Sequence, residues 1–239
     1  FLYFIGLFLS VFPMELLFHP VSQPSRAVQW FMKNHNIDAT FKVVDLMKGE
    51  HVTEAFTAIN PFQAVPVLKL EDGSYLTESS AILNYFATKV NAETEYPTKN
   101  ALAIARIHEA QLRHDNLSRL VTVKVIRPFF ARLANPQLSV DDIRARLQEN
   151  TGDVVWALKT LDAALAHHKF IVSNTLTVAD YNVICELNQI PFIESALPED
   201  LKLSKYPNIA RYLEDAKALP NYESSVAAAA GLLPKLVAQ

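Results

Sequence analysis

Several kinds of residue and pattern are scarce in this chain of 239 residues, beginning with cysteine and glycine. The single cysteine, Cys185, excludes an intrachain disulfide and any metal site built from several thiolates, and it fits a reducing compartment. The five glycines do not form a phosphate-binding glycine loop. A formal net charge of -3 argues against nucleic acid as a partner, because nonspecific binding of nucleic acid requires a basic surface.

Apolar runs long enough to span a bilayer are also missing. Residues 1–12 are almost entirely apolar, but a transmembrane helix needs about 20 such residues. No basic segment precedes this run and no small-residue cleavage site follows it, as a signal peptide would require. We therefore expect residues 1–13 to be an extension outside the fold, with a truncated signal or anchor as the alternative. We expect no membrane partner and a cytoplasmic location.

A hydroxyl residue marks the first change from strand to helix. Residues 14–18 form an apolar run that predicts a buried strand, and apolar positions after Pro24 predict a helix to about Asn34. Ser22 lies at the junction, where the free N–H groups and the dipole of a helix favour an anion. Taken alone, Ser22 is an ordinary helix N-cap. The alternative is that its hydroxyl stabilises negative charge on a ligand.

The next residues extend this unit into a mixed sheet. A second strand is predicted over 40–46, parallel to the first because the connection between them contains a helix. A short helix over 52–59 follows, and then two strands joined by Asp72-Gly73 form a hairpin before a helix over 81–89. Pro66 cannot donate to a sheet ladder, so it belongs at the beginning of a strand, where a cis peptide bond is compatible.

Beyond residue 91 only helical patterns remain. A long helix is predicted over 97–134, bent at Arg127-Pro128 because proline removes a helix hydrogen bond. Ser139 and Thr177 have the capping-box pattern of helix starts, and helices are also predicted over 208–218 and 222–236. The expected organisation is therefore an α/β domain at 14–90 with the order βαβ-α-ββα, a linker at 91–97 and an all-α helical bundle at 98–239.

The order and spacing of these motifs resemble a known family. Val65-Pro66 before the hairpin, Glu78-Ser79 at the next helix and the helical second half resemble the cytosolic glutathione transferases, whose first domain is thioredoxin-like. Residues 21–27 and 45–51, with Asn60-Pro61, are particularly similar to the theta class. The resemblance implies a homodimeric enzyme that conjugates glutathione to small electrophiles, with reduction of organic hydroperoxides as a further activity. Glutathione would be a co-substrate, and no tightly bound cofactor is implied.

The same resemblance implies roles for residues of the first domain. Ser22 matches the catalytic serine, whose hydroxyl donates to the glutathione sulfur and favours its thiolate. Glu78 and Ser79 match the positions that hold the γ-glutamyl end, where a carboxylate suits an ammonium and a helix start suits a carboxylate. Val65, before Pro66, matches the residue whose backbone pairs with the cysteinyl part.

At the glycyl end of glutathione the chain departs from the theta pattern. Theta relatives commonly carry a lysine before the Val-Pro pair, and Ala64 stands there instead. His51 and Gln63 are the substitutes that we expect for the missing cation, and Gln23 completes the implied glutathione-binding set. His108 occupies a place where relatives often carry an aspartate that reaches the partner subunit's glutathione, and no role follows for it.

In the helical domain the resemblance implies a cleft for the second substrate. His114 and Arg119 are our candidates to line it, although a solvated face or a dimer contact explains either residue equally well. His167-His168 lacks the acidic or thiol neighbours that a metal site would need, so no metal is expected. Trp156 and Cys185 lie in apolar helical patterns and are predicted to be core residues.

Two other functions stay open. A thiol-disulfide oxidoreductase would carry Cys-x-x-Cys at the strand-to-helix junction, where this chain has Ser22-Gln23-Pro24-Ser25, and a serine cannot form a mixed disulfide. A non-catalytic glutathione transferase-like protein that binds or scaffolds other molecules is the stronger alternative. The alanine at Ala64 supports it, because it weakens the expected binding of glutathione.

Overall fold

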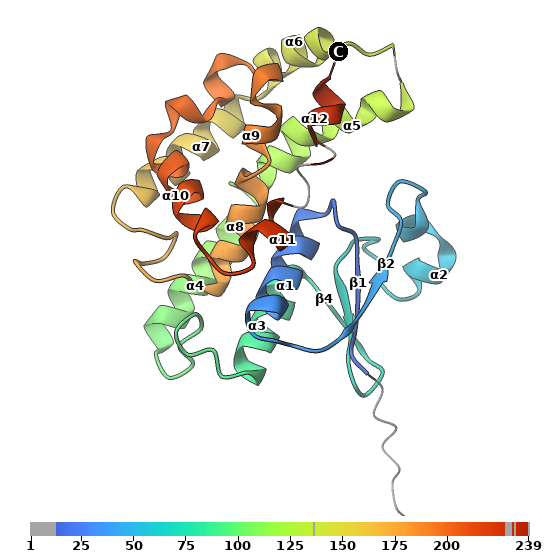
Figure 1. Ribbon diagram of the computed structural model, residues 1–239, viewed down its shortest axis with the longest axis vertical. Coiled ribbons are helices and arrows are strands. Elements are labelled where there is room, and N and C mark those ends of the chain that lie inside the picture. The colour runs from blue at the N-terminus through green and yellow to red at the C-terminus, as the bar shows by residue number, and fades with distance from the viewer. Residues whose placement is uncertain (1–12, 136, 228–230, 232, 239) are drawn as a thin grey trace, which may run out of the picture.

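The computed structural model describes residues 13–135, 137–227, 231 and 233–238. An α/β part comes first along the chain and a helical part follows it, packed side by side (Figure 1). Of the predicted extension at 1–13, residues 1–12 lie outside the described residues.

A four-stranded mixed sheet forms the centre of the α/β part, with the strand order β2-β1-β3-β4. The central strand β1 (Glu15–Phe18) pairs in parallel with β2 (Thr40–Val43), as predicted from the helical connection. On its other side β1 pairs antiparallel with β3 (Val67–Lys69), which forms the predicted hairpin with β4 (Tyr75–Thr77). Because β1 is central, its residues are the most buried of the sheet, whereas β2 is an exposed edge.

Two helices cover the face of the sheet that is turned toward the helical part, α1 (Gln23–Asn34) and α3 (Ser79–Lys89) (Figure 1). The helix predicted over 52–59 is instead a 3-10 turn, η1 (Glu50–Val52), followed by the short α2 (Glu54–Thr57) on the other side of the sheet. Thr53 separates the two because it adopts an extended conformation and caps α2.

The helical part contains no strand among the described residues. Its elements are α4 (Ala101–His114), the π-helical η2 (Val121–Ile126), α5 (Arg127–Ala134), α6 (Val140–Asn150), α7 (Gly152–Leu165), α8 (Val178–Leu187), α9 (Ile190–Ile193), three 3-10 turns η3 (Glu194–Ala196), η4 (Glu199–Leu201) and η5 (Leu203–Lys205), α10 (Pro207–Lys217), α11 (Tyr222–Ser225) and α12 (Leu233–Val237). The helix α8 lies at the centre of this part and packs against α1 (Figure 1).

The long helix predicted over 97–134 is interrupted, and the break lies well before Arg127-Pro128. The chain leaves the helix after His114, turns through residues 115–118 and re-enters it through η2. Pro128 lies in the first turn of α5, which continues directly from the π-helical η2, so the chain stays helical through the proline. The helices that were predicted after Ser139 and over 222–236 are also each divided into two.

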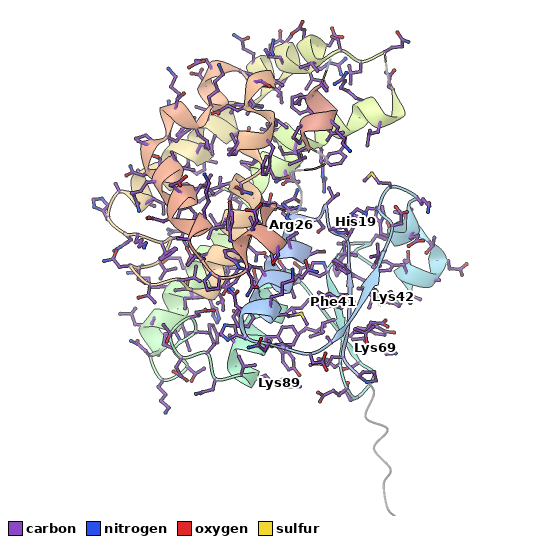
Figure 2. All side chains as sticks on the ribbon, viewed as in Figure 1. His19, Arg26, Phe41, Lys42, Lys69 and Lys89 are labelled. Atoms are coloured by element: carbon purple, nitrogen blue, oxygen red, sulfur yellow. The ribbon has the colours of Figure 1, made fainter. Side chains whose placement is uncertain are left out.

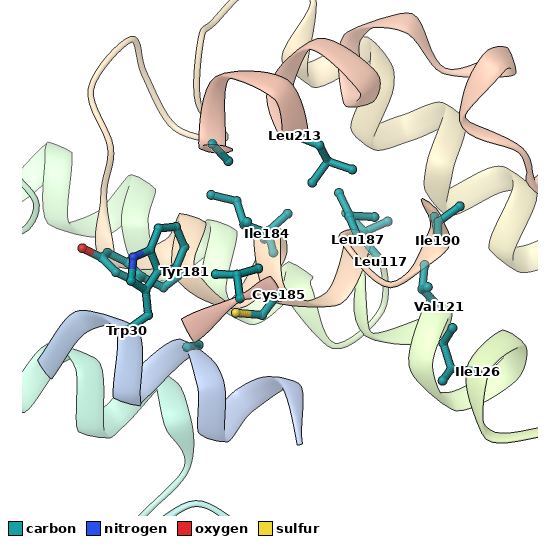
Figure 3. Close-up of a cluster of buried hydrophobic side chains, with 14 of the residues drawn as sticks. Trp30, Leu117, Val121, Ile126, Tyr181, Ile184, Cys185, Leu187, Ile190 and Leu213 are labelled. Atoms are coloured by element: carbon teal, nitrogen blue, oxygen red, sulfur yellow. The ribbon is translucent and has the colours of Figure 1, made fainter. Parts of the chain in front are cut away.

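A continuous apolar core joins the two parts (Figure 3). Trp30 of α1 is fully buried, and its ring lies 4.7 Å from the ring of Tyr181 on α8, measured between centroids. Cys185 is buried beside them, as predicted. Trp156 is not a core residue, because it is 60% exposed. The core stripe of α7 is formed at helical spacing by other residues, namely Val154, Ala157, Leu158, Leu161 and Leu165, and Trp156 lies off it.

Candidate active site

Ser22 caps α1 just beyond the C-terminal end of β1. The backbone N–H of Ser25 donates to Ser22 Oγ at 3.4 Å, and Ser22 Oγ donates to the carbonyl oxygen of Val65, also at 3.4 Å. Pro24 occupies the first turn of α1, as expected of a proline near Ser22. Both contacts of the hydroxyl are long and Ser22 is only half-buried, so the hydroxyl retains capacity for a stronger partner.

Two adjoining hollows meet at Val65. The smaller has a volume of about 260 Å³, and its lining includes Ser22, Gln23, His51 and Gln63. The larger has a volume of about 580 Å³, and its lining includes Pro66, Glu78, Ser79, His108 and His114. Both are bordered by Ala64, Val65 and Arg119. The fold therefore brings every residue that we predicted for glutathione and for the second substrate to one continuous region.

Backbone groups without partners face the larger hollow. Glu78 has a φ of 66°, a left-handed conformation that is costly for a residue other than glycine and that often marks ligand sites. No side chain caps α3 after it, which leaves the first N–H groups, beginning at Ser79, available to an anion. The N–H of Val65 also has no partner within the described part of the chain. The Val65-Pro66 peptide bond is cis, as its sequence position allowed.

Side chains around the smaller hollow differ in what they can still bind. His51 has a buried Nδ1 with no hydrogen-bond partner in the residues that the structure describes. Gln63 donates its amide to Thr57 Oγ1 at 3.1 Å. Gln23 borders the hollow, but its side chain is buried and donates to Gln189 of the helical part. Of the three, His51 is the residue with a buried polar atom that has no partner in the described part of the chain.

Behind Gln23 lies a buried polar network that sequence patterns did not reveal. Glu186 of α8 is fully buried, pairs with Arg119 Nη1 at 2.6 Å and accepts a hydrogen bond from Thr122. Gln189 donates to Thr122 Oγ1 at 2.6 Å. Burial raises the pKa of Glu186, and the Arg119 guanidinium opposes that rise. The available signal was a glutamate in the apolar second half of α8, where a charged residue indicates a buried, paired charge.

The two candidates for the second-substrate cleft, Arg119 and His114, differ in how far they are exposed to solvent. Arg119 borders both hollows, and a quarter of its side chain is exposed. His114 is only 7% exposed, and its Nδ1 lies 2.6 Å from Ser118 Oγ. Burial, aided by the charge of Arg119, lowers the pKa of His114 to about 4, so this imidazole is neutral at neutral pH. His108 borders the larger hollow and contacts the hydroxyl of Tyr96 at 2.9 Å.

The described residues show neither a metal-binding cluster nor a membrane-spanning helix. They contain no group of three or more histidine, cysteine, aspartate and glutamate side chains arranged to hold a metal ion. None of their helices is long and apolar enough to cross a membrane.

Comparison with known proteins places this geometry in a family. Residues 16–94 match the glutathione S-transferase N-terminal domain, and residues 124–220 match the glutathione S-transferase C-terminal domain. Glutathione S-transferase theta-2 of Rattus norvegicus is 35% identical over 179 residues, which cover 74% of this chain and 71% of the relative. Glutathione S-transferase theta-1 of Homo sapiens is 36% identical over 180 residues, which cover 73% and 72%.

Solved structures agree with this assignment. A Bombyx mori glutathione transferase aligns with a TM-score of 0.77 and 24% identity, covering 95% of this chain and 99% of that one, which shows the shared fold. A delta-class glutathione transferase of Nilaparvata lugens aligns with a TM-score of 0.75 and 27% identity, covering 94% and 98%. With both domains matched in order and theta-class proteins among its relatives, the chain belongs to the glutathione S-transferase family.

Proposed function

We propose that this chain binds glutathione across the two hollows and that Ser22 stabilises its thiolate for attack on small electrophiles. The observation that carries the proposal is the 3.4 Å contact between Ser22 Oγ and the Val65 carbonyl oxygen. The Ser22 hydroxyl therefore lies beside Val65, whose backbone N–H has no partner in the described chain. A peptide with a thiol can pair with that segment as an added strand and present its sulfur to the hydroxyl.

The remaining groups of glutathione match the chemistry of the same hollows. The uncapped start of α3 at Ser79 suits the γ-glutamyl carboxylate, and the exposed Glu78 carboxylate suits the neighbouring ammonium. In the smaller hollow, the unpaired Nδ1 of His51 and the guanidinium of Arg119 suit the glycyl carboxylate. Arg119 in particular supplies a cation near the position where Ala64 provides none.

The proposed reaction needs only an ionised sulfur in the correct place. A free thiol has a pKa of about 8.5, and a hydroxyl donor together with the positive end of α1 favours its thiolate. The thiolate attacks the electrophilic carbon, a new C–S bond forms, and the leaving group departs with the electron pair of the broken bond. Ser22 neither attacks nor accepts a proton in this scheme. Reduction of organic hydroperoxides by the same thiolate is a second activity that we propose.

The assembly, the location and the domain boundaries of the protein are further proposals. We infer a homodimer and a cytoplasmic location from the family, and domains at 14–90 and 98–239 joined by residues 91–97. Sedimentation velocity tests the dimer. A non-catalytic glutathione-binding protein is the second candidate, favoured by Ala64 and by the engagement of the Gln63 amide with Thr57.

Affinity capture and turnover separate these candidates. Retention on immobilised glutathione and elution by free glutathione test binding, and an aryl halide, an alkyl halide and cumene hydroperoxide test turnover. We expect Ser22→Ala to lower kcat about a hundredfold, the usual cost of removing one donor to a reacting anion, while glutathione retention persists. Ser139→Ala is the matched control, because Ser139 also caps a helix but borders neither hollow. Unchanged turnover in Ser22→Ala would refute the role of its hydroxyl.

A further inference from the structure

A fully buried arginine lies one helical turn beyond Ser22. Arg26 is 1% exposed, and its backbone N–H donates to the Ser22 carbonyl oxygen at 3.0 Å. Figure 2 shows Arg26 on α1 on the side that meets the helical part, with His19 near the turn that leads into α1. Burial of a guanidinium is unfavourable unless its donors are used, so the partners of Arg26 indicate its role.

Those partners are backbone carbonyl groups. Arg26 Nη1 donates to the carbonyl oxygens of Pro20 at 3.2 Å and Val21 at 2.9 Å, the two residues immediately before Ser22. Arg26 Nη2 donates to the carbonyl oxygen of Cys185 on α8 at 3.3 Å. A guanidinium carries two terminal nitrogens in a fixed planar fork, so it reaches the turn before Ser22 and α8 at once, whereas an ammonium has a single nitrogen for all three acceptors. The turn that carries Ser22 is therefore tied to the centre of the helical part.

Arg26 forms no ion pair in the described chain, although the Glu186 carboxylate acts on its charge from a distance. From α8, Glu186 is paired with Arg119, and burial together with the electrostatics of Glu186 raises the pKa of Cys185 to about 12, so that thiol is neutral. From α11, Tyr222 is neutral because burial raises its pKa. Nearer the hollow, burial lowers the pKa of His19.

His51, Arg119 and Arg127 are the other ionisable side chains that border the smaller hollow. None of them is negatively charged. The electrostatic balance beneath the start of α1 is therefore positive, because two guanidinium groups, those of Arg26 and Arg119, share one carboxylate, that of Glu186.

We infer that Arg26 is a positioning residue for the reaction proposed above, on which this inference rests. By holding the carbonyl groups of Pro20 and Val21 it fixes the turn that aims Ser22 Oγ at the hollow, and its permanent charge beneath the start of α1 favours a thiolate there. Arg26 acts through Ser22 and the local field, and touches neither substrate.

The test compares Arg26→Met, which removes the charge, with Arg26→Lys, which keeps the charge and loses the fork. The readouts are the ultraviolet absorption of the glutathione thiolate in the full-length protein as a function of pH, and the pH profile of kcat/KM. We expect Arg26→Met to raise the apparent pKa of bound thiol by about one unit, which lowers kcat/KM about tenfold at pH values below that pKa. Arg26→Lys is expected to give a smaller rise.

Arg211→Met is the control, because Arg211 also binds three carbonyl groups, those of Leu165 at 2.7 Å, His168 at 3.0 Å and Lys169 at 3.5 Å, away from both hollows, with its charge paired to Asp215. We expect it to keep the wild-type thiol pKa. If both Arg26 variants also keep it, whatever their melting temperatures, Arg26 is only structural and the inference is overturned. If Arg26→Met does not fold, Arg26→Lys decides by the same criterion. Wild-type protein without any thiolate signal would instead refute the proposed function itself.

Discussion

The helices α8 and α1 both begin with a hydroxyl residue, and the surroundings of these two helix starts differ completely. At the start of α8, the Asp180 carboxylate is fully buried and accepts four hydrogen bonds, from the N–H and Oγ1 of Thr177, the N–H of Ile171 and the hydroxyl of Tyr212, at 2.8 to 2.9 Å. At the start of α1, Ser22 is half-buried and makes two contacts of 3.4 Å.

The difference separates a helix start whose polar groups are all used within the protein from one that fits the role proposed for Ser22. Every polar atom of the Thr177 and Asp180 side chains is committed to the protein, so α8 has nothing to offer a ligand. The Ser22 hydroxyl is loosely held and borders a hollow, so a sulfur anion can become its best partner. Local sequence is similar at both places, a hydroxyl residue before an amphipathic or apolar run. Satisfaction of hydrogen bonds, not residue type, distinguishes them.

The largest expected effect is on the free energy of unfolding and arises at the start of α8, where the capping groups all have hydrogen-bond partners. Asp180→Ala leaves the N–H groups of Thr177 and Ile171 and the Tyr212 hydroxyl buried without an acceptor, and we expect a loss of about 4 kcal/mol in the free energy of unfolding. Urea titration followed by circular dichroism measures it. Turnover per folded molecule should not change, because Asp180 borders neither hollow.

The exposed capping box formed by Ser139 and Asp142 gives a control for the buried one formed by Thr177 and Asp180. Asp142 accepts hydrogen bonds from the N–H and Oγ of Ser139 at the start of α6, but it lies in solvent. Asp142→Ala should cost much less than Asp180→Ala, since water replaces the lost carboxylate. Equal losses would show that burial does not set the strength of these helix starts.

The second effect concerns His114, a buried side chain that borders the larger hollow. Its folded pKa of about 4 lies below the ordinary 6.5, so the unfolded chain binds a proton before the folded chain does. The stabilisation is therefore complete above about pH 6.5 and is lost as the pH falls toward about 4, by about 3 kcal/mol. His114→Gln should remove this part of the pH dependence. Identical unfolding profiles for the two proteins would contradict the burial of a neutral imidazole.

Much of the fold was predictable because its signals are local. The alternation of strand and helix patterns gave the parallel pair, the hairpin and the two capping boxes at Ser139 and Thr177. The break after His114 was not predictable in the same way. No glycine or proline stands at residues 115–120, so the turn and η2 depend on how α4 and η2 pack against α8, whereas Pro128 directed the prediction to a later position.

The site was predictable only in part, because its support is nonlocal. The resemblance named residues that line the hollows, including Ser22, Val65 and Ser79. It did not indicate that Gln23 donates to Gln189, or that Arg26 holds the carbonyl group of Cys185. Those contacts join residues more than a hundred positions apart, and no periodic pattern encodes them. They depend on how α1 packs against α8 (Figure 3).

The smallest expected effect is the loss of unfolding free energy in Ser22→Ala. It tests the comparison of the two helix starts most directly, because it measures how much the Ser22 hydroxyl contributes to stability apart from turnover. Ser139 Oγ accepts from the Asp142 N–H at 3.0 Å, and Ser139→Ala should lower the free energy of unfolding by about 1 kcal/mol. Ser22→Ala loses a longer contact of 3.4 Å and should cost less than that. Parallel urea titrations of the two variants decide the order. A larger loss for Ser22→Ala would mean that its hydroxyl is committed to the helix, as the Thr177 hydroxyl is to α8, and is not held in reserve for a bound sulfur.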